Sequence, residues 1–294
     1  MRVDVSEIKS FKNCKRNWEY TSRNRFHLQP FAPNPNFFIG TLVHEALHAL
    51  YIGGPQVMDK VLEMTLKEIP EDSKSDRSML TNIITKYTDQ YLIPDLEQYE
   101  VLDIEHGFSF ELSACPDVEF CGSIDMIVRG KEDGLIYGFE HKTAKAFRNT
   151  FQLKLDEQPR LYTKALQIWA EKKGYQVGGI FVNQVKKTIR ELQVSRVLLT
   201  YTEPDLRGFL NSVCDTVNAM AEHVVMADSV DPEGAYQLPE PSYMGCLICD
   251  LKDICEEYAY ENAPLKTILT EFSEEVHVRE GDHLDEKSER IIEE

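Results

Sequence analysis

The stretch Cys121-Gly-Ser-Ile-Asp-Met-Ile-Val128, followed by Gly138-Phe-Glu-His-Lys-Thr143, predicts two strands joined by a turn. Side chains alternate along a strand, so Glu140 and Lys142 share one face. A hairpin can place Asp125 opposite them, and two carboxylates then meet an amine. Carboxylates bind Mg²⁺ or Mn²⁺ through hard oxygens. Such an ion polarises a phosphate and activates water, while a lysine stabilises developing charge. The pattern therefore indicates phosphodiester hydrolysis.

The segments around this hairpin predict helices packed around a central sheet. Alternating apolar residues mark further strands, and apolar residues at helical spacing mark the segments on either side. Helices around a mixed sheet give an α/β or α+β class. The expected strands are 107–113, 118–128, 134–143, 178–185 and 191–199; the expected helices are 38–51, 57–69, 78–91, 158–172 and 204–226, with a first helix capped by Asp4 or Ser6 and running to about 23, and a loop over 29–36.

Composition is that of an ordinary globular protein. The 294 residues are 42% hydrophobic, which suits one large domain, or one domain and a smaller cap. No apolar run approaches the roughly 20 residues that cross a bilayer, and Met1–Ser10 lacks the apolar stretch of a signal peptide. We therefore expect a cytoplasmic protein whose thiols stay reduced. Seven cysteines there indicate metal binding or buried thiols before disulfides.

The net charge of −18, taken as a sum, argues against a nucleic-acid partner. The distribution of charge matters more than the sum. Basic residues gather in 9–25, 142–164 and 186–190, whereas the tail 271–294 carries ten acids and three bases. Each basic group has the alternative interpretation of a solvated helix face. Together they offer contacts to phosphates, and the tail is expected to be solvated.

A glutamine and a tyrosine follow the hairpin. Gln158 and Tyr162 are four residues apart in the next expected helix, and so lie on one of its faces. That face can meet the strand carrying Lys142 and offer DNA a hydrogen-bonding side chain and a stacking ring. The alternative interpretation is a capping glutamine and a core tyrosine.

The stretch Gly40-Thr-Leu-Val-His-Glu-Ala-Leu-His48 has two interpretations. The first is the H-E-x-x-H signature of zinc metalloproteases, with His44 and His48 as ligands and Glu45 as base. The second gives His44 alone to the metal of the hairpin and leaves His48 as an ordinary helix residue. We favour the second because one active site then uses every unusual feature, whereas the protease leaves the hairpin unexplained.

Cys246, Cys249 and Cys255 form a C-x2-C-x5-C pattern. Three soft ligands this close indicate a thiolate-bound metal, and a closed site needs a fourth. The remaining cysteines are Cys14, Cys115, Cys121 and Cys214. Spacing alone chooses neither among them nor between zinc and an iron–sulfur cluster. The last three sit among apolar or turn residues and are expected to be inert thiols.

Taken in order, these motifs resemble the iron–sulfur RecB-like exonucleases, which include CRISPR-adaptation exonucleases, the AddB-type nuclease domain and phage homologues. The likeness covers roughly residues 5–258. The matching residues are Cys14, Gly40, His44, Asp125, Glu140, Lys142, Gln158, Tyr162, Cys246, Cys249 and Cys255. The sequence departs from the family pattern at Lys15, where a proline is usual, and at Ala144, where glycine is frequent.

The resemblance implies a restriction-endonuclease-like PD-(D/E)XK core with a mixed central sheet flanked by helices. It also implies an iron–sulfur module formed by the N- and C-terminal segments. The implied ligands of Mg²⁺ or Mn²⁺ are His44, Asp125, Glu140 and the backbone carbonyl of His141. The implied catalytic set is Lys142, Asp125 and Glu140, with Gln158 and Tyr162 contacting DNA or ordering the site. The implied ligands of a [4Fe–4S] cluster are Cys14, Cys246, Cys249 and Cys255.

The expected organisation is an N-terminal helix in 1–30, a helical region in 31–105, the nuclease core in 106–235, a cluster-binding segment in 236–262 and an acidic tail in 263–294. The expected activity is that of a DNA exonuclease acting on single strands or free ends, in recombination, repair or DNA degradation. The resemblance implies a helicase, recombinase or CRISPR-type protein as partner. The expected location is the cytoplasm of a bacterium, or of the host cell if the protein is encoded by a phage. The alternatives are the zinc metalloprotease and a DNA-binding accessory protein with a degenerate nuclease fold.

Overall fold

The computed structural model describes residues 1–25, 27, 35–188, 191–230, 243–247, 249, 251–252, 255 and 289–292. The chain forms two compact units. Unit 1 comprises Met1–Pro33, Ser109–Gly122 and Arg207–Glu294, and unit 2 comprises Asn34–Phe108 and Ser123–Leu206. No described helix is both long enough and apolar enough to cross a membrane.

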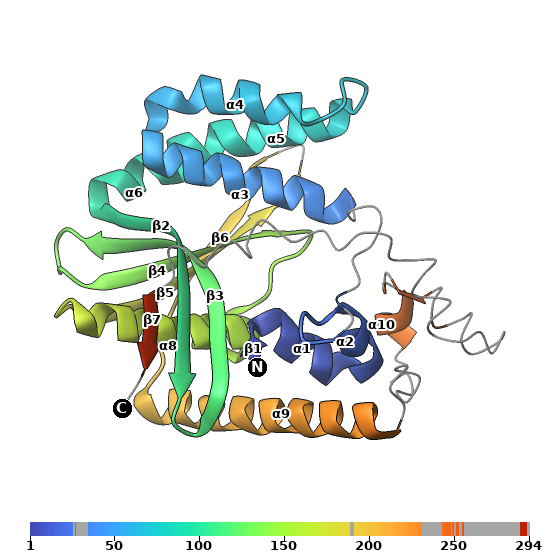
Figure 1. The fold of residues 1–294 in the computed structure, drawn as a ribbon. Helices are drawn as coiled ribbons and strands as arrows, with labels where there is room; N and C mark the ends of the chain where they lie inside the picture. The colour runs from blue at the N-terminus through green and yellow to red at the C-terminus, as the bar shows by residue number, and fades with distance from the viewer. Residues whose placement is uncertain are drawn as a thin grey trace. The chain divides into compact units, whose positions relative to one another are not determined.

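Unit 2 holds most of the helices and strands (Figure 1). Its helices are α3 (Pro35–Gly53), α4 (Met58–Lys67), α5 (Lys74–Tyr87), α6 (Ile93–Gln98), α7 (Thr150–Leu155) and α8 (Glu157–Lys172), with a 3-10 turn at Pro55–Val57 and a π-helical turn at Thr88–Leu92. Its strands are β4 (Ile136–Ala144), β5 (Val177–Lys186) and β6 (Val194–Leu199). β2 (Tyr99–Leu112) and β3 (Cys115–Gly130) contribute to both units.

Unit 1 is built mainly from the two ends of the chain. Its elements are β1 (Arg2–Val3), α1 (Val5–Asn13), α2 (Lys15–Thr21), most of α9 (Glu203–Val230), α10 (Tyr243–Leu247) and β7 (Glu289–Ile292). β1 pairs in parallel with β3, where Val3 faces Phe120. Asp4 caps α1 by accepting a hydrogen bond from the Glu7 backbone, as one of the two expected caps.

The sheet is mixed. β3 pairs antiparallel with β4, β4 pairs parallel with β5, and β5 pairs antiparallel with β6. The Cβ of Gly138 would face Leu166 of α8, whereas that of Gly40 in α3 would meet Thr143, so these two helices cover opposite faces of β4. The apolar core of unit 2 lies on the α3 face, around residues such as Leu47, Ile83 and Phe139. A mixed sheet flanked by helices confirms the expected fold class.

The described elements differ from the sequence-based expectation at several points, and three of these differences have a local cause. The first helix is broken at Cys14, which is extended with φ −162° and separates α1 from α2. β2 begins at Tyr99 rather than 107, because its first half is only partly buried and its charged residues hide the strand pattern. The short α7 was not expected. Its Asn149 and Gln152 form a capping box, a local signal that the sequence does contain.

The basic stretch 9–25 is less available to phosphates than its charge implies. Arg16 is buried. Arg23 binds Asp4 at 2.9 Å, and Arg25 binds Asp228 at 2.8 Å and also pairs with Glu19. Of the six bases in this stretch, one is therefore buried and two are held in ion pairs within unit 1.

Two cysteines expected to be inert thiols are paired. Cys115 of β3 and Cys214 of α9 form a disulfide within unit 1, with their Cα atoms 5.5 Å apart. Both cysteines are buried, in agreement with the apolar residues around them in the sequence. That sequence context gives no sign that the fold brings the two cysteines together. The preference for thiols over disulfides was wrong for this pair.

Candidate active site

The two acids of the hairpin lie side by side at the end of the β3–β4 pairing. Met126 faces Phe139 in the antiparallel register, so the next pair along is Asp125 and Glu140. The backbone N–H of His141 donates to Asp125 Oδ2 at 2.6 Å. Asp125 is 7% exposed and Glu140 is 3% exposed, so both carboxyl groups are buried. The sequence-based expectation of converging carboxylates is met by this geometry.

Lys142 and Gln158 complete the acid cluster. Lys142 Nζ donates to Glu140 Oε1 at 2.8 Å and to Gln158 Oε1 at 2.7 Å. Gln158 Nε2 in turn donates to Glu140 Oε1 at 2.7 Å. Gln158 sits in the first turn of α8, whose N-cap Asp156 accepts from its backbone N–H at 3.0 Å. The start of the helix therefore fixes the side chain that holds the lysine.

His44 reaches the same acids from α3. Its Nδ1 lies 3.6 Å from Asp125 Oδ2. Burial and the neighbouring His48 lower the pKa of His44 to about 4, despite a hydrogen bond to the backbone of His141. The imidazole is consequently neutral near pH 7, which is the form that binds metals.

The charge balance of the acids fits a bound cation. Burial, followed by the charge of Glu140, raises the pKa of Asp125 well above its ordinary value. Burial also raises the pKa of Glu140, while Lys142 opposes that shift. Glu140 Oε2 is buried and has no hydrogen-bond partner among the described residues. Buried carboxylates need a partner, and a divalent ion beside these oxygens and His44 would supply one.

The His141 side chain points to the opposite face of the sheet and is fully enclosed. Its ring stacks on Tyr51 of α3, with centroids 5.8 Å apart, and Asn183 Nδ2 lies 3.4 Å from its Nδ1. Burial lowers its pKa well below the ordinary value. Arg196 donates to Asn183 Oδ1 at 2.6 Å and to Asp95 Oδ2 at 2.7 Å. This buried network fixes the strand whose backbone meets Asp125.

Sequence reasoning missed that network. Asp95 and Arg196 are 101 positions apart, and the three residues lie on three elements, with Asp95 on α6, Asn183 on β5 and Arg196 on β6. A single acid in a helix and a single arginine in a strand carry no local signature. Only the packing of α6 and the strand order bring them together.

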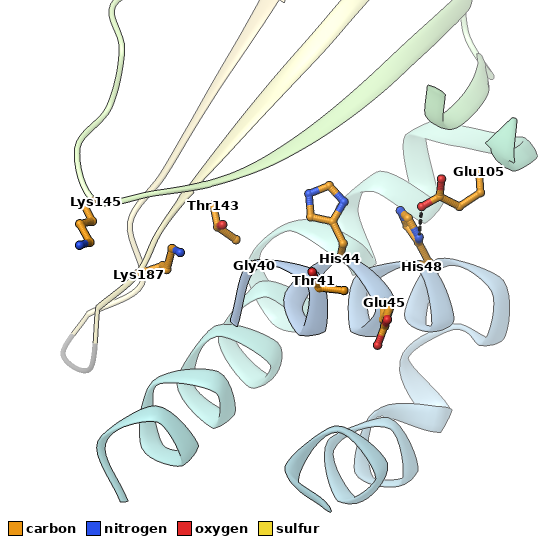
Figure 2. Close-up of a pocket in the computed structure, with 9 residues that line it drawn as sticks. All are labelled: Gly40, Thr41, His44, Glu45, His48, Glu105, Thr143, Lys145 and Lys187. Carbon is orange, nitrogen blue, oxygen red and sulfur yellow. Dashed lines mark ion pairs between the residues drawn. The ribbon is translucent and has the colours of Figure 1, made fainter. Parts of the chain in front are cut away.

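A cavity of about 630 Å³ opens beside the metal-binding candidates (Figure 2). His44, His48 and Glu105 lie at one end, and Lys145 and Lys187 lie at the other. Burial and then the nearby Lys145 lower the pKa of Lys187. The cavity therefore joins a group of metal-ligand types to a basic end.

The zinc-protease interpretation of α3 finds partial geometric support. His44, His48 and Asp125 are the one described group whose metal-ligand atoms all lie within 4.8 Å of one another. Glu45, the base of that interpretation, points away from both imidazole rings (Figure 2). The described arrangement therefore does not place Glu45 beside the two imidazoles, as the protease interpretation requires.

Tyr162 does not offer the open ring that the sequence suggested. It is 8% exposed and packs edge-on against Phe108, with centroids 5.3 Å apart. A ring enclosed in this way presents no face to a base. The stacking expectation is corrected to a packing contact that helps to hold α8 against the sheet.

The cysteines of the expected cluster all belong to unit 1. Burial raises the pKa of the Cys255 thiol; Arg16 opposes this, while Cys249 and Cys14 raise it further. Asn17 Nδ2 lies 3.5 Å from Cys249 Sγ. Cys246 is exposed, and the four sulfurs do not form a described group within 4.8 Å. The fold brings three of the cysteines into one neighbourhood without closing a four-ligand site.

Comparisons with known proteins bear on the family of the chain. No curated protein matches the chain. Twenty-eight chains of solved structures match. Among them, the crystal structure of SSO0001 is 13% identical, covers 74% of this chain and 84% of its own, and has a TM-score of 0.32. The model of the PD-(D/E)XK nuclease superfamily matches residues 2–256. The chain therefore belongs to the PD-(D/E)XK nuclease superfamily.

Proposed function

We propose that the chain is a Mg²⁺- or Mn²⁺-dependent DNA exonuclease whose centre is the cluster on β3, β4 and α8. The observation that carries this proposal is the shared contact of Lys142 and Gln158 with Glu140 Oε1, beside the buried Asp125. A lysine, an amide and two acids arranged around one point suit hydrolysis of a phosphodiester.

The metal ligands proposed are His44, Asp125, Glu140 and the backbone carbonyl of His141. Their fit rests on the orphaned Glu140 Oε2, the neutral His44 and the hydrogen bond between His44 and the His141 backbone. An ion held there supplies Lewis-acid activation of a phosphate oxygen and of water.

The chain's own residues divide the remaining work. Lys142 holds a positive charge beside the acids, where it can orient water or neutralise charge on the phosphoryl group. Gln158 keeps the ammonium of Lys142 at one oxygen of Glu140, which leaves the other oxygen for the ion. Tyr162 acts indirectly, by packing α8 in place.

Access for DNA is proposed through the cavity beside His44. Its volume of about 630 Å³ is that of a small-molecule pocket, which favours a strand end over an intact duplex. Lys145 and Lys187 at its basic end suit a phosphate backbone. The described helices include none with a base-reading motif, so cleavage is expected to depend little on the sequence of the DNA.

The test compares linear single-stranded DNA with closed single-stranded circles of similar sequence in Mn²⁺. An exonuclease shortens the linear strand and leaves the circle intact, and Lys142→Ala does neither. Equal rates on the two substrates would show an endonuclease. Cleavage by the Lys142 variant at the wild-type rate would show that the centre lies elsewhere.

We also propose a [4Fe–4S] cluster held by Cys14, Cys246, Cys249 and Cys255 in unit 1. The support is that Cys249 and Cys14 lie near enough to Cys255 to help raise the pKa of its thiol, together with the extended backbone that separates α1 from α2 at Cys14. Thiolates are the ligands that such clusters require. A cluster would tie residues near the two ends of the chain into one unit.

A further inference from the structure

We propose that His48 is a metal ligand, and that His44, His48 and Asp125 together hold a transition-metal ion, with Glu105 fixing the His48 ring. The proposal shares His44 and Asp125 with the nuclease centre proposed above. It goes beyond that centre by adding a second imidazole and a supporting carboxylate. These two residues have no part in the nuclease assignment.

The three ligand atoms come from two rigid elements. His44 and His48 are four residues apart on α3, and Asp125 is on β3. Their ligand atoms all lie within 4.8 Å of one another, and His44 Nδ1 is 3.6 Å from Asp125 Oδ2. Atoms at metal–ligand distances of about 2 Å from one ion lie within such a range of each other. Figure 2 shows both rings projecting from the same side of the helix.

The contacts of the His48 ring resemble those of a metal-bound histidine. Its Nδ1 lies 2.9 Å from Glu105 Oε1. That contact keeps the proton on Nδ1 and leaves a lone pair on Nε2. His48 is 9% exposed, and its Nε2 is buried with no hydrogen-bond partner among the described residues. Metal-bound histidines commonly donate their other ring N–H to a carboxylate in this manner.

The backbone at Glu105 gives an independent indication. Glu105 has φ +52°, although it is not glycine and lies inside β2. A residue other than glycine rarely adopts this conformation, and such strain concentrates at functional sites. Ser123 Oγ donates to the second carboxylate oxygen of Glu105 at 2.9 Å. The strained residue is therefore held by one contact and holds His48 by the other.

The ligand chemistry selects the type of ion. Two imidazoles and one carboxylate suit Mn²⁺, Co²⁺, Ni²⁺ or Zn²⁺, whereas Mg²⁺ prefers oxygen ligands. The cavity that His44 and His48 line would give water or substrate access to an ion held there. We infer that this pair of histidines shifts the preference of the centre from Mg²⁺ toward transition metals.

The experiment uses the full chain, with Mn²⁺ as the probe and no DNA present. Mn²⁺ binding is followed by electron paramagnetic resonance, and pulsed measurements count the imidazole nitrogens coupled to the bound ion. The variants are His48→Asn and Glu105→Gln. The matched control is His106→Ala, because His106 forms a similar pair with Asp103, at 2.8 Å, away from the cavity lining.

The wild type is expected to show two coupled imidazoles and His48→Asn one. His48→Asn should weaken Mn²⁺ binding roughly 10- to 100-fold, Glu105→Gln should weaken it in the same direction, and His106→Ala should leave it unchanged. A single coupled imidazole in the wild type would overturn the proposal. An affinity of Glu105→Gln for Mn²⁺ equal to that of the wild type would overturn it too. Glu105→Gln keeps His48 in place, so it tests the proposal even if His48→Asn fails to fold. Cleavage of DNA is judged separately through Lys142, so either proposal can fail alone.

Discussion

Gln158 accepts a hydrogen bond from Lys142 Nζ at 2.7 Å and so ties the first turn of α8 to the strand that carries the acids. The same amide donates to Glu140 Oε1 at 2.7 Å. A lysine side chain has four rotatable bonds, and fixing its ammonium costs conformational entropy. The hydrogen bond from Lys142 to Gln158 offsets that entropy cost in the folded protein. The ammonium of Lys142 is therefore positioned before substrate binds.

Replacing Lys142 with alanine should abolish most cleavage and leave the fold intact. The ammonium stabilises charge in the transition state and contributes little to the core, so we expect a loss on the order of 100- to 1,000-fold in kcat. Cleavage of labelled linear DNA and the thermal melting temperature measure the two effects. The matched control is Lys67→Ala, which removes an exposed lysine paired with Glu63 on α4. A similar loss of activity in the control would point to instability instead of catalysis.

Replacing Gln158 with leucine should lower kcat by roughly tenfold, with little change in KM, because the lysine loses its positioning but keeps its charge. The shape of the side chain is largely kept, so the start of α8 should persist. Steady-state kinetics on a short single strand separate the two constants. A change confined to KM would show that Gln158 contacts DNA and does not position Lys142.

Metal binding should stabilise the protein more at high pH than at low pH. The folded pKa of Asp125 is raised well above its ordinary value of 3.8, by burial and by Glu140. In the metal-free chain its protonated form therefore contributes stability below about pH 4, and this is lost as pH rises through the raised pKa. Mn²⁺ replaces the proton and restores the stability.

Melting temperatures with and without Mn²⁺, measured between about pH 5 and pH 8, test this prediction. In the wild type, the increase in melting temperature caused by Mn²⁺ should become larger as the pH rises. In Asp125→Asn this increase should be much smaller, because the amide has no proton to release. An increase that is independent of pH in the wild type would contradict the raised pKa.

The protein purified without oxygen should be brown and hold about four irons per chain if the proposed cluster forms. Replacing Cys14, Cys246, Cys249 or Cys255 with serine should remove the colour and lower the melting temperature. Cys121→Ser is the control, since Cys121 is buried against the backbone of Val3 and takes no part in the proposed cluster. A colourless protein with one zinc would refute the cluster and leave the nuclease proposal standing.

Reduction of the Cys115–Cys214 disulfide should destabilise unit 1. The bond closes a loop with a sequence separation of 99, and a loop of this length constrains the unfolded chain by on the order of 5 kcal/mol. Melting with and without a reductant, and mass spectrometry after alkylation, measure the effect and count the thiols. Full alkylation of both cysteines without reduction would show that they are free in solution.

The positions of β3 to β6, to within a few residues, and the identity of the acid–acid–lysine set follow from the amino-acid pattern alone. Alternation along a strand depends only on local geometry, so Glu140 and Lys142 had to share a face. The hairpin then brought Asp125 opposite Glu140, because the turn between the strands is short. The capping of α1 by Asp4 followed from the same kind of local rule.

Which distant side chains complete the site depends on how the elements pack in three dimensions. The pairing of His48 with Glu105 and that of Arg196 with Asp95 join residues 57 and 101 positions apart, and neither residue type carries a local signal of its partner. Tyr162, which the sequence predicts to offer an open ring, is enclosed because it packs against Phe108 of β2. Contacts between separate elements depend on packing and strand order, and a sequence pattern records only the neighbours within one element.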